Sequence, residues 1–313
     1  MNEADKKAED MRIDLSTSVA GVNLSNPLMT ASGTFAAAVS GAFYDINELG
    51  AAVTKGVAPI PWEGNPSPRI AEAYGGMINS VGLQNPGVDA FIDGELKLLQ
   101  TYDTKIIVNV AGHSLDDYIQ VVERLSDIDS IAMLEINISC PNLSEGGMAF
   151  GTDPHMAAQV TREVRRYTKK PLILKLTPNV SDITEIAKAV ESEGANAVSL
   201  INTLKAMHID LKRRCCTLAN RKGGLSGPAV KPIALCMVYD TVRAVNIPVI
   251  GIGGISTGGD AAEFIAAGAS AVGIGTAALV DPVAIPRIKQ ELIEFMKEND
   301  FETLSELRHA FSL

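Results

Sequence analysis

Cysteine is scarce in this chain of 313 residues, which contains only Cys140, Cys215, Cys216 and Cys236. None of them forms a C-x-x-C motif or has the ligand spacing of a zinc site, and the histidines form no His-x-x-x-His motif. A chain of this length can bury enough surface to fold without disulfides or metals. The sequence therefore predicts no metal site and a reduced, cytoplasmic protein, and we assign no role to Cys215 and Cys216.

Positive charge is also in deficit, because 27 Lys and Arg residues face 37 Asp and Glu residues and leave a net charge of −10. A nucleic-acid partner calls for a basic face, so this balance argues against one. No stretch approaches the roughly 20 apolar residues that span a bilayer, and the charged first ten residues lack the apolar run of a signal peptide. We expect no membrane partner, a mobile tail over residues 1–11, and a single folded domain over residues 12–313.

Short apolar runs alternate with helical patterns along that domain. The runs are apolar on both faces, which favours parallel strands covered by helices. Eight such units in one chain of this size predict an α/β fold, the TIM (β/α)8 barrel. A doubly wound sheet is the alternative, because strand order cannot be read from one sequence. The predicted strands are residues 27–32, 51–57, 105–110, 132–139, 172–177, 197–202, 249–253 and 271–276.

Helices are predicted over residues 115–125, 181–193 and 258–267, from polar residues at the starts of the first two and glycines at the ends of the last two. Two connections are longer than a barrel needs, namely the loops after strands 2 and 6, over residues 57–104 and 203–227. Long loops in a compact domain are commonly functional. Both leave the carboxyl ends of strands, the face where barrel active sites assemble, so we expect them near the site.

Polar residues and glycines stand at the carboxyl ends of all eight predicted strands. A purely structural account does not explain why amides and two lysines interrupt apolar strands, so we interpret these residues as one convergent site. In strand order they are Ser32, Lys55 with Gly56, Asn109, Asn137, Lys175, Asn202 with Thr203, Gly253 with Gly254, and Gly275 with Thr276.

The glycines of the last two strands favour a phosphorylated ligand. Glycine lets the backbone approach a phosphate closely, and TIM barrels commonly bind phosphate at this place. Tight packing of strand against helix also uses glycine, but two such sites on consecutive strands favour the ligand. The spacing is not the Rossmann fingerprint, and no acidic residue follows at the required distance.

Lys175 lies inside the apolar run 172–176. A lysine that points into the barrel is costly unless an anion pairs with it, whereas one on the outside extends its ammonium between helices. An inward Lys175 would stabilise the negative charge of a reduced flavin, or form a Schiff base with a carbonyl substrate, as in a barrel aldolase. The residues around it do not choose between these two chemistries.

Cys140 is the sharpest catalytic candidate. It follows Asn137, Ile138 and Ser139 at a strand end, and a glycine-containing stretch over residues 144–152 follows that we expect to close over a ligand. A thiolate there would act as a base or nucleophile, because the ordinary cysteine pKa of about 8.5 needs only modest tuning. We expect Cys236 to be a small buried hydrophobe. Among the histidines, His113 is the one placed near the site.

Three motifs resemble the dihydroorotate dehydrogenases. They are NSVGLQNPG over residues 79–87, NISCPN over residues 137–142 and GGLSGPAVKP over residues 223–232. The likeness runs from about residue 12 to the carboxyl terminus. The first and third motifs most closely resemble the NAD-linked B type, a catalytic subunit that works with an electron-transfer subunit.

The resemblance implies oxidation of (S)-dihydroorotate to orotate in de novo pyrimidine (UMP) biosynthesis. A base removes the C5 proton while hydride passes from C6 to N5 of FMN, and in soluble members this base is the cysteine of the second motif, here Cys140. Electrons then pass to NAD through a partner that carries FAD and a [2Fe-2S] cluster, with a homodimer core inside a heterotetramer. This chain has no four-cysteine cluster motif or Rossmann fingerprint, which agrees with those cofactors lying on the partner.

The resemblance also assigns contact residues. Those expected to bind FMN are Ser32, Lys55, Gly56, Asn109, Asn137, Lys175, Ile201, Gly227, Gly253, Gly254, Gly275 and Thr276. Those expected to bind the substrate are Lys55, Asn79, Ser80, Val81, Gly82, Leu83, Asn137, Asn202 and Thr203.

Three alternatives stay open at this point. One is the A-type enzyme, a homodimer that uses fumarate without a partner. Another is a flavin-free lyase with Lys175 as its Schiff-base residue. The third is a barrel that keeps the pocket for binding alone.

Overall fold

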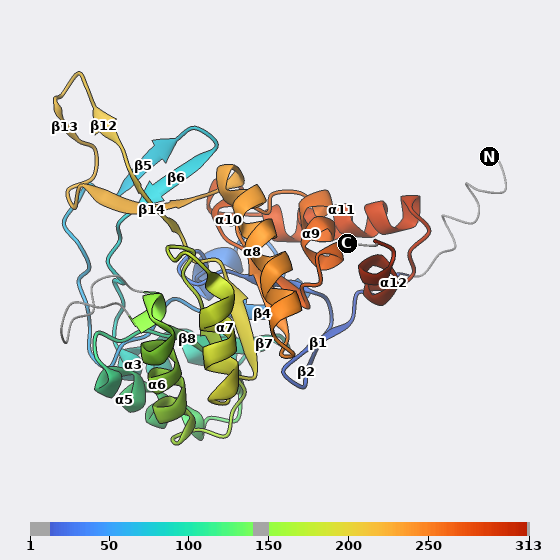
Figure 1. Cartoon of the computed structure of the whole chain (residues 1–313), viewed down its shortest axis with the longest axis horizontal. Coiled ribbons are helices and arrows are strands. Elements are labelled where there is room, and N and C mark those ends of the chain that lie inside the picture. Colours follow the sequence, from blue (N-terminus) through green and yellow to red (C-terminus); the bar gives the residue numbers. More distant parts are fainter. Residues whose placement is uncertain (1–12, 140–149, 312–313) are drawn as a thin grey trace.

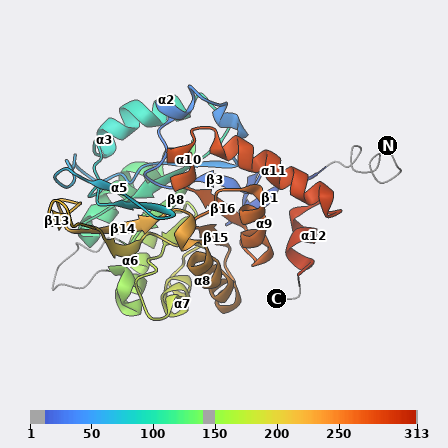
Figure 2. The same cartoon turned by 90° about the horizontal axis from the view of Figure 1, so that it is seen from above.

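The computed structural model describes residues 13–139 and 150–311, and the expected tail over residues 1–11 lies outside them. Eight parallel strands form a closed barrel in the order β10-β15-β16-β3-β4-β7-β8-β9, ringed by helices (Figures 1 and 2). The predicted TIM barrel is confirmed, and closure excludes the doubly wound sheet. The barrel strands are β3 (Leu28–Thr30), β4 (Ala51–Val53), β7 (Lys105–Val110), β8 (Ile131–Asn137), β9 (Leu172–Lys175), β10 (Ala197–Leu200), β15 (Val249–Ile252) and β16 (Ala271–Ile274).

The lower interior of the barrel is apolar. One inward-facing residue or more from each strand joins a single buried cluster, which includes Ile107, Met133 and Ile173. Val19 and Leu24 belong to the same cluster and come from a hairpin of β1 (Thr17–Val19) and β2 (Val22–Leu24). This hairpin therefore closes the barrel at the amino-terminal ends of its strands.

The predicted helices are confirmed with small shifts at their ends, as α5 (Leu115–Ser126), α7 (Ile183–Ser192) and α9 (Gly258–Ala266). Ser114 caps α5 in a capping box and Thr257 does the same for α9, which satisfies backbone N–H groups that a helix start leaves free. The other α-helices are α2 (Ala37–Ser40), α3 (Val88–Phe91), α4 (Lys97–Leu99), α6 (Pro154–Arg165), α8 (Lys231–Ala244), α10 (Thr276–Val280), α11 (Ala284–Glu298) and α12 (Leu304–His309). Single 3₁₀ turns are η1 (Ile46–Glu48), η3 (Phe150–Thr152) and η4 (Pro228–Val230), and the π-helical segment η2 (Ile92–Leu96) joins α3 to α4.

The two long connections are not plain loops, because they contribute an antiparallel sheet in the order β11-β14-β6-β5. The sheet projects from the barrel at the upper left of Figure 1. Asn79 pairs with Gly224 within it, so segments 145 residues apart lie side by side. Its strands are β5 (Ile70–Ala73), β6 (Gly76–Asn79), β11 (Leu204–Met207) and β14 (Lys222–Ser226), with a smaller ribbon of β12 (Ile209–Asp210) and β13 (Cys215–Cys216) beside it.

The expectation for Cys236 is wrong, because this cysteine is exposed on α8. The helix buries Ala234, Val238 and Thr241, which share one face. Cys236 lies two residues after Ala234, and a step of two residues in a helix turns a side chain to the opposite side.

Across the described part of the chain, no helix combines the length and the apolar character needed to cross a membrane.

Candidate active site

A polar layer of five side chains caps the apolar interior of the barrel. Successive inward-facing positions on a strand are two residues apart. For five strands, the position two residues after the last member of the apolar cluster is polar. These polar residues are Lys55, Asn109, Glu135, Lys175 and Ser199. All but Lys55 are buried. The layer stands at the carboxyl ends of the strands, where the sequence predicted a site.

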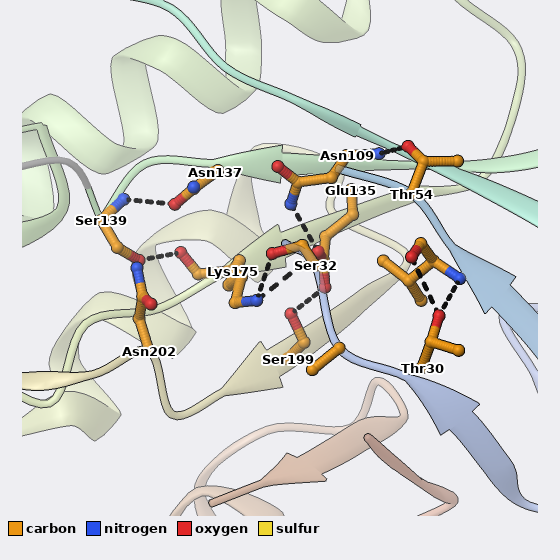
Figure 3. Close-up of polar contacts among 12 residues, drawn as sticks. Thr30, Ser32, Thr54, Asn109, Glu135, Asn137, Ser139, Lys175, Ser199 and Asn202 are labelled. Carbon is orange, nitrogen blue, oxygen red and sulfur yellow. Dashed lines mark hydrogen bonds and ion pairs between the residues drawn. The ribbon is translucent and has the colours of Figure 1, made fainter. Parts of the chain in front are cut away.

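Glu135 holds this layer together (Figure 3). One of its carboxylate oxygens, Oε2, accepts a hydrogen bond from Asn109 Nδ2 at 2.5 Å, and Oε1 accepts one from Ser199 Oγ at 2.7 Å. The ammonium of Lys175 lies 3.9 Å from Glu135 Oε2 and donates to Ser32 Oγ at 2.8 Å. Lys175 therefore points into the barrel beside an anion, and the outward-facing alternative is wrong.

Lys55 brings a second ammonium group to the same place. The pKa of the Lys55 ammonium is lowered, mainly by burial and further by the positive charge of Lys175. No described residue makes a hydrogen bond or ion pair with the Lys55 ammonium. Two lysines against the one carboxylate of Glu135 leave this end of the barrel suited to an anionic ligand.

Glycines with positive φ line the far side of the site, where three backbone segments approach one another. Gly253 and Gly254 follow β15 with φ of +138° and +74°, and Gly227 precedes η4 with φ of +104°. A Cβ on Gly254 would lie 2.8 Å from the Gly227 carbonyl oxygen, so a side chain does not fit there. Gly227, Gly253 and Gly254 all line one cavity, and glycine backbone at a cavity wall suits a phosphate group.

One cavity of about 790 Å³ connects these parts. It extends from the strand ends to the antiparallel sheet, and every residue predicted to contact cofactor or substrate lines it. These residues are Ser32, Lys55, Gly56, Asn79, Ser80, Val81, Gly82, Leu83, Asn109, Asn137, Lys175, Ile201, Asn202, Thr203, Gly227, Gly253, Gly254, Gly275 and Thr276.

The catalytic candidate Cys140 lies outside the described residues. Its neighbour Ser139 lines the cavity and donates from Oγ to the Lys175 carbonyl oxygen at 2.7 Å. The strand end before it is also fixed from behind, since Tyr118 on α5 donates to the Asn137 carbonyl oxygen at 2.7 Å. His113 is not among the cavity residues, because its ring stacks on Trp62 with centroids 3.7 Å apart.

Sequence reasoning missed Glu135 and Ser199. A usable signal existed for Glu135, because a carboxylate inside the apolar run of β8 is as unusual as Lys175 inside β9. Glu135 and Lys175 account for each other's burial, because their opposite charges lie 3.9 Å apart. Ser199 carried no such signal, since a lone serine in a strand is common.

Asn109 carries a buried hydrogen-bond acceptor that has no partner among the described residues. The Nδ2 of Asn109 donates to Glu135. The Oδ1 of Asn109 is one of two buried side-chain atoms in residues 13–139 and 150–311 that have no hydrogen-bond partner. Leaving a buried acceptor unpaired costs about 1–3 kcal/mol. Asn109 and Gly56 both line the cavity, and a Cβ added to Gly56 would lie 2.9 Å from Oδ1, so a ligand donor packed against Gly56 would be within reach of this acceptor.

These features define a class of protein, a TIM barrel with a polar, cationic pocket and a glycine-lined wall that suits a phosphorylated ligand. The model of the family described as dihydroorotate dehydrogenase matches residues 14–296. The chain therefore belongs to the dihydroorotate dehydrogenase family.

Individual relatives agree with this result. The chain is 54% identical over 298 residues to dihydroorotate dehydrogenase B (NAD(+)), catalytic subunit, of Alkaliphilus metalliredigens, covering 95% of this chain and 98% of that one. The protein of the same name in Lachnoclostridium phytofermentans is 52% identical over 296 residues, covering 94% and 98%. The family and the B type predicted from the three motifs are confirmed, and with them an oxidoreductase that acts on dihydroorotate.

A solved structure supports the fold. The crystal structure of DHODH from Eimeria tenella in complex with ferulenol superimposes with a TM-score of 0.77, covering 96% of this chain and 89% of that one. Its sequence identity is 22%, so this likeness bears on the barrel and not on the ligands.

Proposed function

We propose that this chain is the FMN-binding catalytic subunit of a B-type dihydroorotate dehydrogenase, with residues 12–313 as one domain. It oxidises (S)-dihydroorotate to orotate in pyrimidine biosynthesis. The observation that carries the proposal is that all the described contact residues assigned from the family motifs line one cavity. The printed names of the relatives support the substrate and the type.

The residues present fit FMN. The glycine-lined wall at Gly227, Gly253, Gly254 and Gly275, with Thr276, would hold the phosphate. Asn109 Oδ1 offers a buried acceptor to a ring N–H, and the Lys175 ammonium offers positive charge to a ring that becomes anionic on reduction. When bound, FMN supplies the hydride acceptor. Ser32, Lys55, Gly56, Asn137 and Ile201 complete the proposed contacts.

The substrate is a planar carboxylate with cyclic amide groups, and its proposed contacts match that chemistry. Lys55 pairs with the carboxylate, and the amides of Asn79, Asn137 and Asn202 pair with the ring. Cys140 takes the C5 proton as hydride leaves C6. Thr203 and residues 80–83 complete the proposed pocket.

The partner assignments rest on the relatives' names. "Catalytic subunit" implies a separate subunit, and "NAD(+)" names the acceptor of those enzymes. We propose that the partner carries FAD and a [2Fe-2S] cluster, and that two copies of this chain form the core of a heterotetramer. We also place the enzyme in the cytoplasm, since its described cysteines are free and disulfides are rare there.

The Schiff-base alternative finds no support at Lys175. Its Nζ already donates to Ser32 and faces Glu135, whereas a Schiff-base lysine needs a free, neutral amine beside the substrate. A colourless, flavin-free preparation that still acts on a carbonyl compound would restore that alternative.

Anaerobic mixing with dihydroorotate tests cofactor, substrate and reaction together, because the flavin absorbance should bleach. A Cys140→Ala variant should keep its flavin and bleach orders of magnitude more slowly. Cys236→Ala is the matched control, since this cysteine is exposed on α8. Unchanged bleaching in Cys140→Ala would remove the cysteine as the base, and rapid turnover with fumarate in the absence of a partner would favour the A type.

A further inference from the structure

We infer that Glu135 is a positioning residue that sets the electrostatics of the flavin site through Lys175 and Asn109, and that its charge lowers the reduction potential of the bound flavin. The inference rests on the proposed function, in that it takes the cavity to hold a flavin. It concerns a residue that lies below the cavity and is not among its lining residues.

The contacts of Glu135 suit a carboxylate. Its side chain is 3% exposed, and its three partners are the amide Nδ2 of Asn109, the hydroxyl of Ser199 and the ammonium of Lys175. Oε2 faces only donors, Asn109 Nδ2 and the Lys175 ammonium, and neither could accept a proton from an acid, while the Ser199 hydroxyl donates to Oε1. A negative charge thus lies under the cavity, out of reach of solvent screening.

The first consequence concerns Lys175. Its side chain is 4% exposed, and its ammonium lies between Ser32 Oγ at 2.8 Å and Glu135 Oε2 at 3.9 Å. Glu135 offsets one of the two lysine charges that would otherwise act together on the ligand, because Lys55 also lies at this end of the barrel. With Glu135 neutral, the site would carry one more net positive charge and would favour an anionic, reduced flavin more strongly.

The second consequence concerns Asn109. Glu135 accepts from its Nδ2 and so fixes which end of the amide faces the cavity. The unpaired Oδ1 is then the end left for a ligand, since Asn109 lines the cavity. The carboxylate therefore specifies an acceptor at this wall, and a flipped amide would present a donor in its place.

The test is the reduction potential of the flavin in the complete enzyme carrying Glu135→Gln. Glutamine keeps the size and can still accept from Asn109, so it removes the charge and leaves the amide orientation. We expect the oxidised-to-reduced equilibrium to shift at least tenfold toward reduced flavin, which for a two-electron couple is about 30 mV. Sulfite is a second probe, because its addition also leaves negative charge on the flavin ring, and its dissociation constant should fall at least tenfold.

Ser199→Ala is the matched control, since it removes a hydrogen bond to Glu135 and keeps the charge. Its potential should stay close to that of the unmodified enzyme. If Glu135→Gln does not fold, Glu135→Met removes the same charge and should shift the potential in the same direction, but it also removes the acceptor that orients Asn109.

A lowered melting temperature with an unchanged potential and unchanged sulfite affinity would overturn the inference and leave Glu135 a structural residue. Failure of the proposed function is a separate outcome, because it would show in the unmodified enzyme as absent flavin or absent bleaching by dihydroorotate.

Discussion

Replacing Gly254 by alanine should weaken FMN binding more than any comparable change outside the site. The residue has φ of +74°, and a Cβ would lie 2.8 Å from the Gly227 carbonyl oxygen and 2.8 Å from both the backbone nitrogen and the Cβ of Lys231. A left-handed conformation costs an alanine roughly 1–2 kcal/mol. Overlap with packed atoms adds about 1–3 kcal/mol.

The two costs together are roughly 2–5 kcal/mol. Two of the three crowded atoms belong to Lys231, the first residue of α8, and the third is the Gly227 carbonyl oxygen. None of them can move alone, so relieving the overlap requires Gly254 and this backbone to separate. If binding FMN must restore the closed wall, its dissociation constant should rise roughly 30-fold to several thousand-fold.

The assay is FMN titration of the stripped protein, followed by flavin fluorescence. Gly21→Ala is the matched control, because Gly21 has a similar φ of +81° but no atom within 4 Å of the added Cβ, and it lies in the β1–β2 turn. It carries the strain without the overlap and should bind FMN normally. Normal FMN affinity in Gly254→Ala would refute the claim that this backbone wall holds the phosphate.

Three further predictions concern the lysine pocket and the barrel. Lys55→Met, assayed with its flavin content measured alongside, should raise the KM for dihydroorotate by roughly tenfold or more, the cost of losing a charge-assisted contact of about 1.5–3 kcal/mol, measured by steady-state kinetics. Because the pKa of Lys55 is lowered, its charge is complete at low pH and is lost as pH rises through a value below 10.5; affinity for the anionic substrate should fall over that range, and Lys55→Arg should move the fall to higher pH. Tyr118→Phe removes the hydrogen bond to the Asn137 carbonyl oxygen and should lower the free energy of unfolding by about 0.5–1.5 kcal/mol, measured by denaturant titration; an unchanged value would mean that water replaces the hydroxyl.

The barrel could be predicted because the pattern that identifies each strand lies within a short stretch of sequence. The segment 105–110 was predicted with the bounds that β7 has, since it is apolar on both faces and ends at a turn. The antiparallel sheet could not be predicted in the same way. The sequence of β14, Lys-Gly-Gly-Leu-Ser, lacks β-branched residues, and its partner β6 is far away in the chain.

The site was predictable to the extent that single residues stand out against their surroundings. Lys175 did, because a charge inside an apolar strand requires an explanation. The role of Glu135 needed the fold, since Asn109 on β7 and Ser199 on β10 meet it only inside the closed barrel. Cys236 was misjudged because residue type was weighed without its place on the helix.

The pairing of β6 with β14 connects two parts of the cavity through backbone hydrogen bonds. β6 ends at Asn79, directly before the proposed substrate segment 80–83, and β14 ends at Ser226, directly before Gly227 of the glycine-lined wall. We expect a ligand that fixes one strand end to pre-organise the other through the backbone hydrogen bonds between β6 and β14. By thermodynamic linkage the effect is reciprocal, so each ligand should raise the affinity for the other by the same factor.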